Sequence, residues 1–162
     1  MTLTEFVNLY DGTKVGDGQC VALIKQYEQE VLNLTPVAVG NAHQYYDNYE
    51  NEEFLYTNFD RITYDGTNKP EIGDIIVWSI AVGQGAGHIA IAYYNIEESS
   101  FISFDQNWNT PLLCQLETHT YNNVLGWLRY KGQIPEPQPV MIEKKKFPWQ
   151  IFTRKIRKRR SI

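Results

Sequence analysis

The sequence has 162 residues, of which 43% are hydrophobic and 21% are charged. This length supports one domain with an ordinary core, and two cysteines are too few for a disulfide framework, so we expect Cys20 and Cys114 to be free thiols. No apolar run approaches the ~18 residues needed to cross a membrane, and the first residues lack the basic and apolar segments of a secretory signal peptide. We therefore expect neither a membrane-spanning helix nor a signal peptide.

The net charge of -4 is divided unevenly along the chain. Residues 1–132 contain 6 Lys and Arg against 17 Asp and Glu, whereas residues 133–162 contain 9 against 2. Prolines at 135, 137 and 139 are typical of an extended linker. We therefore expect an acidic domain over 1–132, a proline-rich linker over 133–143, and a basic, disordered or amphipathic tail over 144–162. Such a charge asymmetry indicates a second interaction surface.

The first fifty residues predict helices. Apolar residues at 6, 9 and 10 predict a short helix over 4–10, capped by Thr2 or Thr4. A loop with three glycines then leads to Cys20, where apolar residues begin to recur at helical spacing and continue to Leu32. We expect a central helix with Cys20 in its first turn, followed by a third short helix over 41–49.

The later part of the chain predicts strands. The segment 50–67 has an irregular pattern apart from one strand over 59–64, and apolar or alternating runs predict strands over 75–78, 88–94, 101–108 and 122–130. Residues 97–100 are typical of a hairpin turn, which places the strands on either side of it next to each other. Helices followed by an antiparallel sheet indicate an α+β fold.

In this arrangement we expect a thiol, an imidazole and two polar side chains to lie close together. Cys20 lies at a helix N-terminus, where the helix dipole stabilises a thiolate, and His88 begins a strand after a glycine-rich loop. Asp105 and Asn107 lie on the neighbouring strand, where alternation puts both on one face and Gln106 on the other. Cysteine hydrolases need such a set: a thiolate, an imidazole that transfers the proton, and a group that orients the imidazole.

Taken singly, each of these residues has a structural interpretation. An isolated cysteine is usually a small buried side chain, and polar residues near a strand end are usually turn or capping residues. We interpret His43 as a surface or hydrogen-bonded histidine, and Cys114 and His119 as structural residues. The hypothesis of a cysteine hydrolase therefore depends on the combination.

Four short motifs follow one another along the chain: Gly18-Gln19-Cys20-Val21, Gly73-Asp74-Ile75-Ile76-Val77-Trp78, Gly87-His88-Ile89-Ala90 and Asp105-Gln106-Asn107-Trp108. Their residues, order and spacing resemble those of the cysteine, histidine-dependent amidohydrolase/peptidase (CHAP) family, and the resemblance covers roughly residues 3–131. The family has a papain-like α+β fold, cleaves amide bonds in bacterial peptidoglycan, and is common in bacteriophage lysins and bacterial autolysins.

The resemblance implies roles for residues in these motifs. Cys20 matches the nucleophile, His88 the general base and acid, and Asn107 a polar group that helps to orient the imidazole. Asp105 stands where phage-type members often have glutamate; it can still accept the imidazole N–H, and the choice of main orienting residue between 105 and 107 stays open. The backbone N–H of Cys20 is expected to contribute to the oxyanion site.

Some members of the family bind calcium through closely spaced aspartates just before the cysteine. Asp11 and Asp17 occupy this loop here, but Lys14 lies between them, and a cation at this place argues against a metal site. We therefore expect no required cofactor, and Asp11 and Asp17 are the weak candidates for calcium ligands.

The resemblance implies a peptidoglycan hydrolase, either an N-acetylmuramoyl-L-alanine amidase or an endopeptidase of the stem peptide or cross-bridge, and in particular a phage lysin. The alternatives are an NlpC-type cysteine peptidase, which normally orients its histidine with a second histidine, and a catalytically inactive wall-binding or virion structural module. We expect a monomer without a specific nucleic-acid partner, made in the host cytoplasm and acting at the bacterial wall or carried in the virion. The basic tail is expected to bind anionic wall polymers or a membrane surface.

Overall fold

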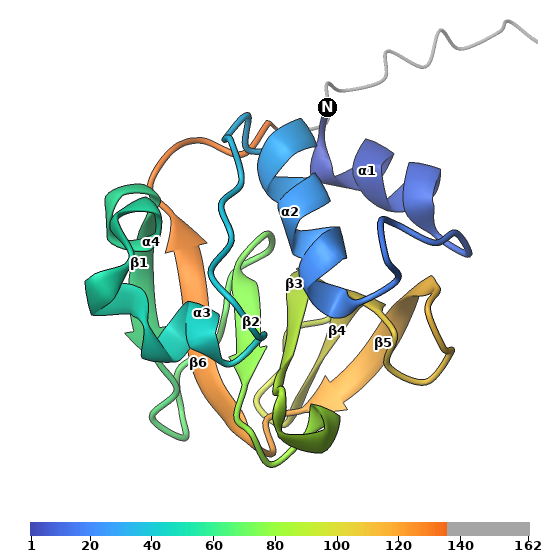
Figure 1. Ribbon diagram of the computed structural model, residues 1–162. Coiled ribbons are helices and arrows are strands. Elements are labelled where there is room, and N and C mark those ends of the chain that lie inside the picture. Colours follow the sequence, from blue (N-terminus) through green and yellow to red (C-terminus); the bar gives the residue numbers. More distant parts are fainter. Residues whose placement is uncertain (136–162) are drawn as a thin grey trace, which may run out of the picture.

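The computed structural model describes residues 1–135, in which α1 and α2 lie on one face of an antiparallel sheet (Figure 1). The sheet has six strands in the order β1-β6-β2-β3-β4-β5. The helices are α1 (Leu3–Tyr10), α2 (Cys20–Glu30), α3 (Gln44–Asp47) and α4 (Glu53–Asn58), with 3-10 turns η1 (Tyr49–Asn51) and η2 (Gly83–Gly85). The strands are β1 (Phe59–Thr63), β2 (Ile75–Trp78), β3 (His88–Tyr94), β4 (Ser100–Gln106), β5 (Cys114–Thr120) and β6 (Val124–Tyr130).

The first two helices form where the sequence supplies a cap and an apolar stripe. Thr2 caps α1, because its side chain accepts the backbone N–H of Glu5 while the Glu5 carboxylate accepts the N–H of Thr2. α2 buries Leu23 and Ile24 completely and packs against β3 and β4. This packing fixes the axis of α2 over the sheet, and with it the position of Cys20 at the first residue of the helix.

The sheet carries a hydrophobic layer on each face. Ile75 and Val77 of β2 join the larger cluster beneath the helices, whereas Ile76 and Trp78 join a second cluster around Trp127 on the opposite face. All four residues of β2 are buried for this reason. A strand covered on both sides is a continuous apolar run, which is the pattern that the sequence shows over 75–78.

The predicted α+β class is confirmed, as are the strands over 75–78 and 88–94 and the start of the central helix at Cys20. Among the α-helices and strands of the described chain, two were not predicted: α4, which lies in the segment expected to be irregular, and β5. The helix expected over 41–49 is shorter and continues into η1. The strand expected over 101–108 ends at Gln106, because Asn107 adopts a φ of 64° and turns the chain out of the sheet.

The described region ends just after the predicted linker begins. Ile134 fills the space that a Cβ atom on Gly73 would need, and Tyr27 beside it donates its hydroxyl hydrogen to the Gly73 carbonyl oxygen at 2.9 Å. The remainder of the linker and the tail over 144–162 lie outside the described residues, so these boundaries stay predictions. Of the helices within residues 1–135, none combines the length and the hydropathy needed to span a membrane.

Candidate active site

Cys20, a half-buried free thiol, is the first residue of α2. The loop before it passes through Gly16 and Gly18, which both adopt positive φ angles, and so turns sharply into the helix. The first turn, residues 20–23, contains no acidic side chain that would oppose negative charge on the sulfur. The positive end of the helix dipole at this place stabilises a thiolate.

His88 begins β3 opposite Trp78 of β2 and is only 4% exposed. Its ring centroid lies 5.3 Å from that of Trp78 and 4.8 Å from that of Trp108. Gly87 allows this close approach, since its φ is +74° and a Cβ atom there would lie 2.7 Å from the Trp78 carbonyl oxygen. The aromatic neighbours and the tight turn together hold the imidazole in one orientation.

The imidazole of His88 has Asp105 and the Cys20 side chain as neighbours. Its Nε2 lies 3.3 Å from Asp105 Oδ2, and the Cys20 side chain is close enough to act on the pKa of the ring. Burial alone lowers the pKa of His88, but the hydrogen bonds to Asp105 and Cys20 outweigh burial and raise the pKa to about 9. At neutral pH the ring therefore carries a proton and can pair with a thiolate on Cys20.

Asp105 is shared between two histidines. Its Oδ2 atom also lies 2.6 Å from Nε2 of His119, a residue of β5 that is 5% exposed. Burial alone raises the pKa of the Asp105 carboxyl, but hydrogen bonds with His119 and His88 outweigh burial and bring this pKa below its ordinary value. The interpretation of His119 as merely structural missed this contact, and the only signal for it was the weak alternation of residues 114–120.

Asn107 is hydrogen-bonded to the cysteine loop and not to the imidazole of His88. Its Nδ2 donates to Gln19 Oε1 at 3.0 Å, and its Oδ1 accepts the backbone N–H of Leu112 at 2.9 Å. The expectation that Asn107 shares a face with Asp105 is wrong, because β4 ends before Asn107. Of the two candidates for orienting His88, the structure places Asp105 against the ring.

Gln106 positions the loop that carries Cys20, a role that the sequence patterns did not indicate. Its side chain points to the helix face, where Oε1 accepts the Val15 N–H at 2.7 Å. Its Nε2 donates to the carbonyl oxygens of Val15 and Gln19, at 3.0 and 2.7 Å. The amide of Gln106 is fully buried, and a buried amide needs hydrogen-bond partners. Gln106 thus ties β4 to the residues just before Cys20.

We expect Gln106→Leu to lower both stability and activity. The substitution leaves the N–H of Val15 without its partner in a buried place and removes one of the two hydrogen bonds to each of the carbonyl oxygens of Val15 and Gln19, which together costs about 2–4 kcal/mol in the free energy of unfolding. Urea unfolding measures the stability, and the rate of Cys20 alkylation measures the loop geometry. The control Gln29→Leu changes an exposed glutamine of α2 and should alter neither quantity appreciably. Equal unfolding midpoints for the two variants would contradict the assigned role.

A family model of the CHAP domain matches residues 9–107, more than half of the chain. The match includes Cys20, His88, Asp105 and Asn107. The chain belongs to the CHAP domain family. Among curated proteins, none is similar enough in sequence to count as a match.

Solved structures share the CHAP fold of this chain. The wild-type endolysin LysIME-EF1 is 27% identical with a TM-score of 0.62, and the match covers 77% of this chain and 61% of that one. Ly7917 is 17% identical with a TM-score of 0.61, covering 80% and 62%. An N-acetylmuramoyl-L-alanine amidase from Staphylococcus aureus is 16% identical with a TM-score of 0.52, covering 70% and 30%. The chain therefore matches less than two thirds of the length of each protein.

The loop before Cys20 does not assemble the ligands of the calcium site found in some CHAP domains. Asp17 Oδ1 accepts the backbone N–H of Gln19 at 2.9 Å, and Asp11 is the C-cap of α1. Among residues 1–135, no three His, Cys, Asp or Glu side chains gather in a metal-binding cluster. Calcium takes about six to eight oxygen ligands. The two candidate carboxylates do not fit this requirement, and the mechanism proposed below uses no metal.

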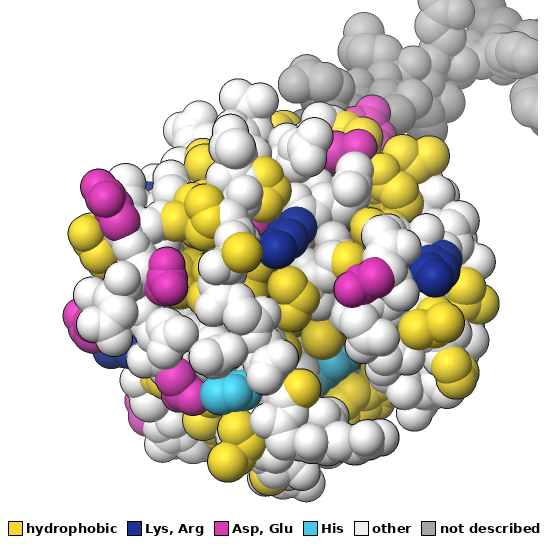
Figure 2. Space-filling model, viewed as in Figure 1, with side chains coloured by type: hydrophobic (Ala, Val, Ile, Leu, Met, Phe, Trp, Pro, Cys, Tyr) yellow, Lys and Arg dark blue, Asp and Glu magenta, His cyan; other side chains and the backbone are white. Residues whose placement is uncertain are grey.

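A cavity of about 350 Å³ adjoins the CHAP site next to His119. Trp108, which is 37% exposed, forms part of its wall, together with threonine and asparagine side chains from β5 and the turn after it. In the space-filling view, histidine surface lies below the start of α2, next to apolar side chains (Figure 2). The cavity offers an aromatic surface and neutral hydrogen-bonding groups beside the reactive residues.

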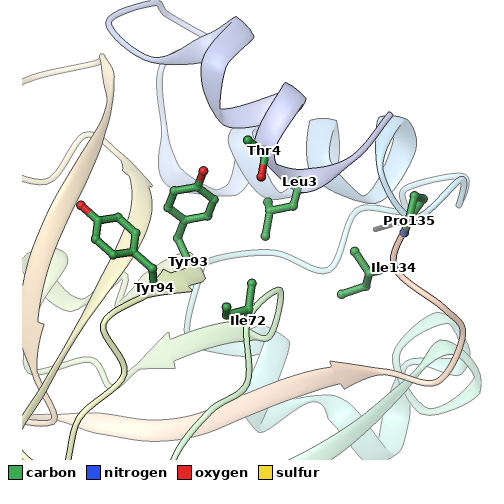
Figure 3. A pocket seen from close by; sticks show the side chains of 7 residues that line it. All are labelled: Leu3, Thr4, Ile72, Tyr93, Tyr94, Ile134 and Pro135. Carbon is green, nitrogen blue, oxygen red and sulfur yellow. The ribbon is translucent and has the colours of Figure 1, made fainter. Parts of the chain in front are cut away.

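A second cavity, of about 540 Å³, lies away from this chemistry. Its walls are mostly apolar and come from α1, the end of β3 and the start of the linker (Figure 3). Met1 nearby donates its terminal N–H to the carbonyl oxygen of Glu30, at the end of α2 opposite Cys20. The lining residues are Leu3, Thr4, Ile72, Tyr93, Tyr94, Ile134 and Pro135.

Proposed function

We propose that the chain is a peptidoglycan hydrolase that cleaves an amide bond with Cys20 as its nucleophile. The observation that carries the proposal is the buried imidazole of His88, which contacts Asp105 at 3.3 Å and lies close enough to the Cys20 side chain for Cys20 to raise its pKa. Membership in the CHAP family and the likeness to an endolysin at 27% identity support peptidoglycan as the substrate. Such an enzyme acts at the bacterial cell wall, and a phage lysin is the form that fits these relatives.

The proposed reaction begins with attack of the Cys20 thiolate on the amide carbonyl carbon. The carbonyl electron pair moves to oxygen, and the oxyanion accepts a hydrogen bond from the backbone N–H of Cys20 at the start of α2. His88 then gives its proton to the amide nitrogen as the C–N bond breaks, which releases an amine and leaves a thioester on Cys20. Water attacks the thioester while His88 takes its proton, and the carboxylic acid product leaves as the thiolate forms again.

The raised pKa of His88, about 9, suits this reaction. The leaving amine needs a proton, and a ring with this pKa holds one throughout the neutral range. Asp105 supports the positive charge from the far side of the ring, at 3.3 Å from Nε2.

Two kinds of amide bond are candidates, and mass spectrometry of the released fragments distinguishes them. An N-acetylmuramoyl-L-alanine amidase separates the glycan from an intact stem peptide with a new amine on its alanine. An endopeptidase leaves the glycan attached and creates a new amine within the stem or cross-bridge. Fragments released by the wild type and absent from a digest with Cys20→Ala support the proposal. A wild-type digest without either fragment would overturn it.

The two alternatives differ from this proposal at His119 and at Cys20. An NlpC-type site orients its histidine with a second histidine, but the rings of His88 and His119 are 6.5 Å apart between centroids, with Asp105 hydrogen-bonded to both. An inactive wall-binding or virion module needs no reactive thiolate. Rapid alkylation of Cys20 by iodoacetamide near pH 7 therefore favours the enzyme, and slow alkylation favours the module.

The basic tail is proposed to hold the enzyme on anionic wall polymers. Changing Arg157, Lys158, Arg159 and Arg160 to Gln in the full chain removes four of the nine cations that follow residue 132. We expect binding to purified walls to fall about 5-fold or more at low salt and to equal that of the wild type near 1 M salt, where charges are screened within about 3 Å. Equal sedimentation of both proteins with walls at low salt would contradict this role.

A further inference from the structure

Asp105, the carboxylate that contacts His88, makes its shorter hydrogen bond with another histidine, His119. Asp105 Oδ2 lies 2.6 Å from His119 Nε2 and 3.3 Å from His88 Nε2. The other oxygen, Oδ1, is buried and has no hydrogen-bond partner among residues 1–135. Within the described chain, this carboxylate is therefore hydrogen-bonded by two imidazoles that meet at one oxygen.

The Asp105 carboxylate determines which ring nitrogens of the two histidines carry a hydrogen. An ionised carboxylate only accepts hydrogen bonds, so Nε2 of His119 must carry a hydrogen to bond with it, and Nε2 of His88 must do the same. A carboxylate that is 1% exposed is strongly disfavoured unless donors surround it. A single bond of 3.3 Å from His88 is a poor substitute for hydration, and the bond from His119 supplies the second donor.

Aromatic side chains hold His119 in the position that this bond requires. Its ring is stacked on Phe101 at 5.6 Å with an interplanar angle of 26°, and it meets Trp108 edge to face at 4.8 Å. Trp78 lies on a further side at 4.9 Å. Trp108 and Trp78 also contact His88, so the same side chains fix both imidazoles on the two sides of Asp105.

We propose that His119 is a positioning residue for the hydrolysis proposed above: it donates its Nε2–H to Asp105 and thereby keeps this carboxylate ionised and directed at His88. The inference deepens the proposed function, since its effect on hydrolysis assumes that function. Its effect on the alkylation of Cys20 does not, because the contacts of Asp105 with His88 and His119 are present without substrate.

The charged and titratable groups around His119 are few. Asp105 on β4 faces it directly, and His88 on β3 lies beyond that carboxylate. Glu117 on its own strand accepts a hydrogen bond from Asn109 instead, and the side chains packed on the ring from β2 and β4 are uncharged aromatics. Loss of the His119 donor therefore acts chiefly on Asp105, which takes up a proton more easily and then supports the imidazolium of His88 less.

The test compares Gln and Asn in place of His119 in the full chain, because their side-chain amides extend to different lengths. In His119→Gln the side-chain amide nitrogen stands about where Nε2 of histidine stands, whereas in His119→Asn it falls short of Asp105. The readouts are the rate of Cys20 carboxymethylation by iodoacetamide from pH 5 to 10 and kcat and KM on purified walls. His119→Phe adds a variant that fills the space without a donor, and circular dichroism checks that each protein is folded.

We expect His119→Gln to stay within about 3-fold of the wild type in both readouts. His119→Asn and His119→Phe should lose about 10-fold or more in kcat and in the alkylation rate at pH 7, with KM nearly unchanged. Their alkylation profiles should move toward that of an ordinary thiol, which reacts mainly above about pH 8. If Phe at this position prevents folding, the Gln and Asn pair still decides, because both side chains end in a polar amide and differ only in how far it reaches toward Asp105.

Two results would overturn the inference: an alkylation profile in His119→Asn equal to that of the wild type, or equal losses in the Gln and Asn variants. The failure of this inference and that of the proposed function are distinguishable. Walls cleared equally fast by the wild type and His119→Asn would remove the role of His119 and leave the hydrolase. A reactive Cys20 whose alkylation depends on His119, in a protein that releases nothing from walls, would keep the role of His119 and remove the hydrolase.

Discussion

Replacing Cys20 with alanine is expected to reduce wall hydrolysis by about 10³-fold or more, because no other group in the site can form the thioester. The sulfur is half-buried at the start of α2, so the loss of one atom should leave the fold intact. The measurement is the loss of turbidity of purified Gram-positive walls, with circular dichroism to compare the folded states. Clearing of walls by Cys20→Ala at the wild-type rate would show that the nucleophile is another group.

The chain offers a matched control in its second thiol. Cys114 is fully buried in β5, and burial raises the pKa of its thiol to about 12, so it should not react with iodoacetamide at neutral pH. In Cys114→Ser the hydroxyl keeps the hydrogen bond that the sulfur donates to Gln106 Oε1. We expect Cys114→Ser to hydrolyse walls within about 3-fold of the wild type and to incorporate the same single carboxymethyl group at Cys20.

Asp105→Asn should lower kcat by about 10² to 10⁴-fold with a small change in KM. The amide has nearly the same shape but no charge, so it no longer supports the positive charge of His88 and can present its own N–H to Nε2. Both histidines contact the carboxylate at Oδ2, so an amide nitrogen at that place removes the acceptor of both. The control Asp60→Asn changes an exposed carboxylate of β1 and should leave kcat unchanged.

The pH profile separates this electrostatic effect from a general loss of structure. Because the pKa of His88 is raised to about 9, wild-type activity should persist through neutral pH and fall as the pH rises through that value. Without the Asp105 carboxylate, which helps to raise this pKa, the fall should move to lower pH. The same alkaline limit in the wild type and in Asp105→Asn would contradict the assignment.

The sequence located those site residues whose position depends on local structure. A glycine-rich loop before an apolar helical stripe placed Cys20 at a helix start, and a β-branched run placed His88 at the start of a strand. The neighbouring position of β4 followed from the hairpin between β3 and β4. These three features depend on turns and on hydrophobic periodicity, which are visible in one segment at a time.

The remaining features depend on contacts between distant segments. β5 is an edge strand whose residues alternate only weakly, so its existence is fixed by pairing with β4, in which His119 stands opposite Phe101. Asn107 departs from strand alternation through a single positive φ angle. Asparagine tolerates such an angle, but an asparagine in the sequence does not by itself predict one. Gln106 was assigned correctly to the other face, but its partners Val15 and Gln19 lie about ninety residues earlier in the chain.

The contact of Ile134 with Gly73 has a practical consequence for building fusions of this CHAP domain with other modules. The folded unit extends at least two residues beyond Gly132, because Ile134 covers Gly73 beside the fully buried Tyr27. A targeting module should therefore be joined after Pro135, so that the spacer leaves this isoleucine in place. A junction at Gly132 would uncover apolar surface beside α2, and the resulting fusion should be more prone to aggregate.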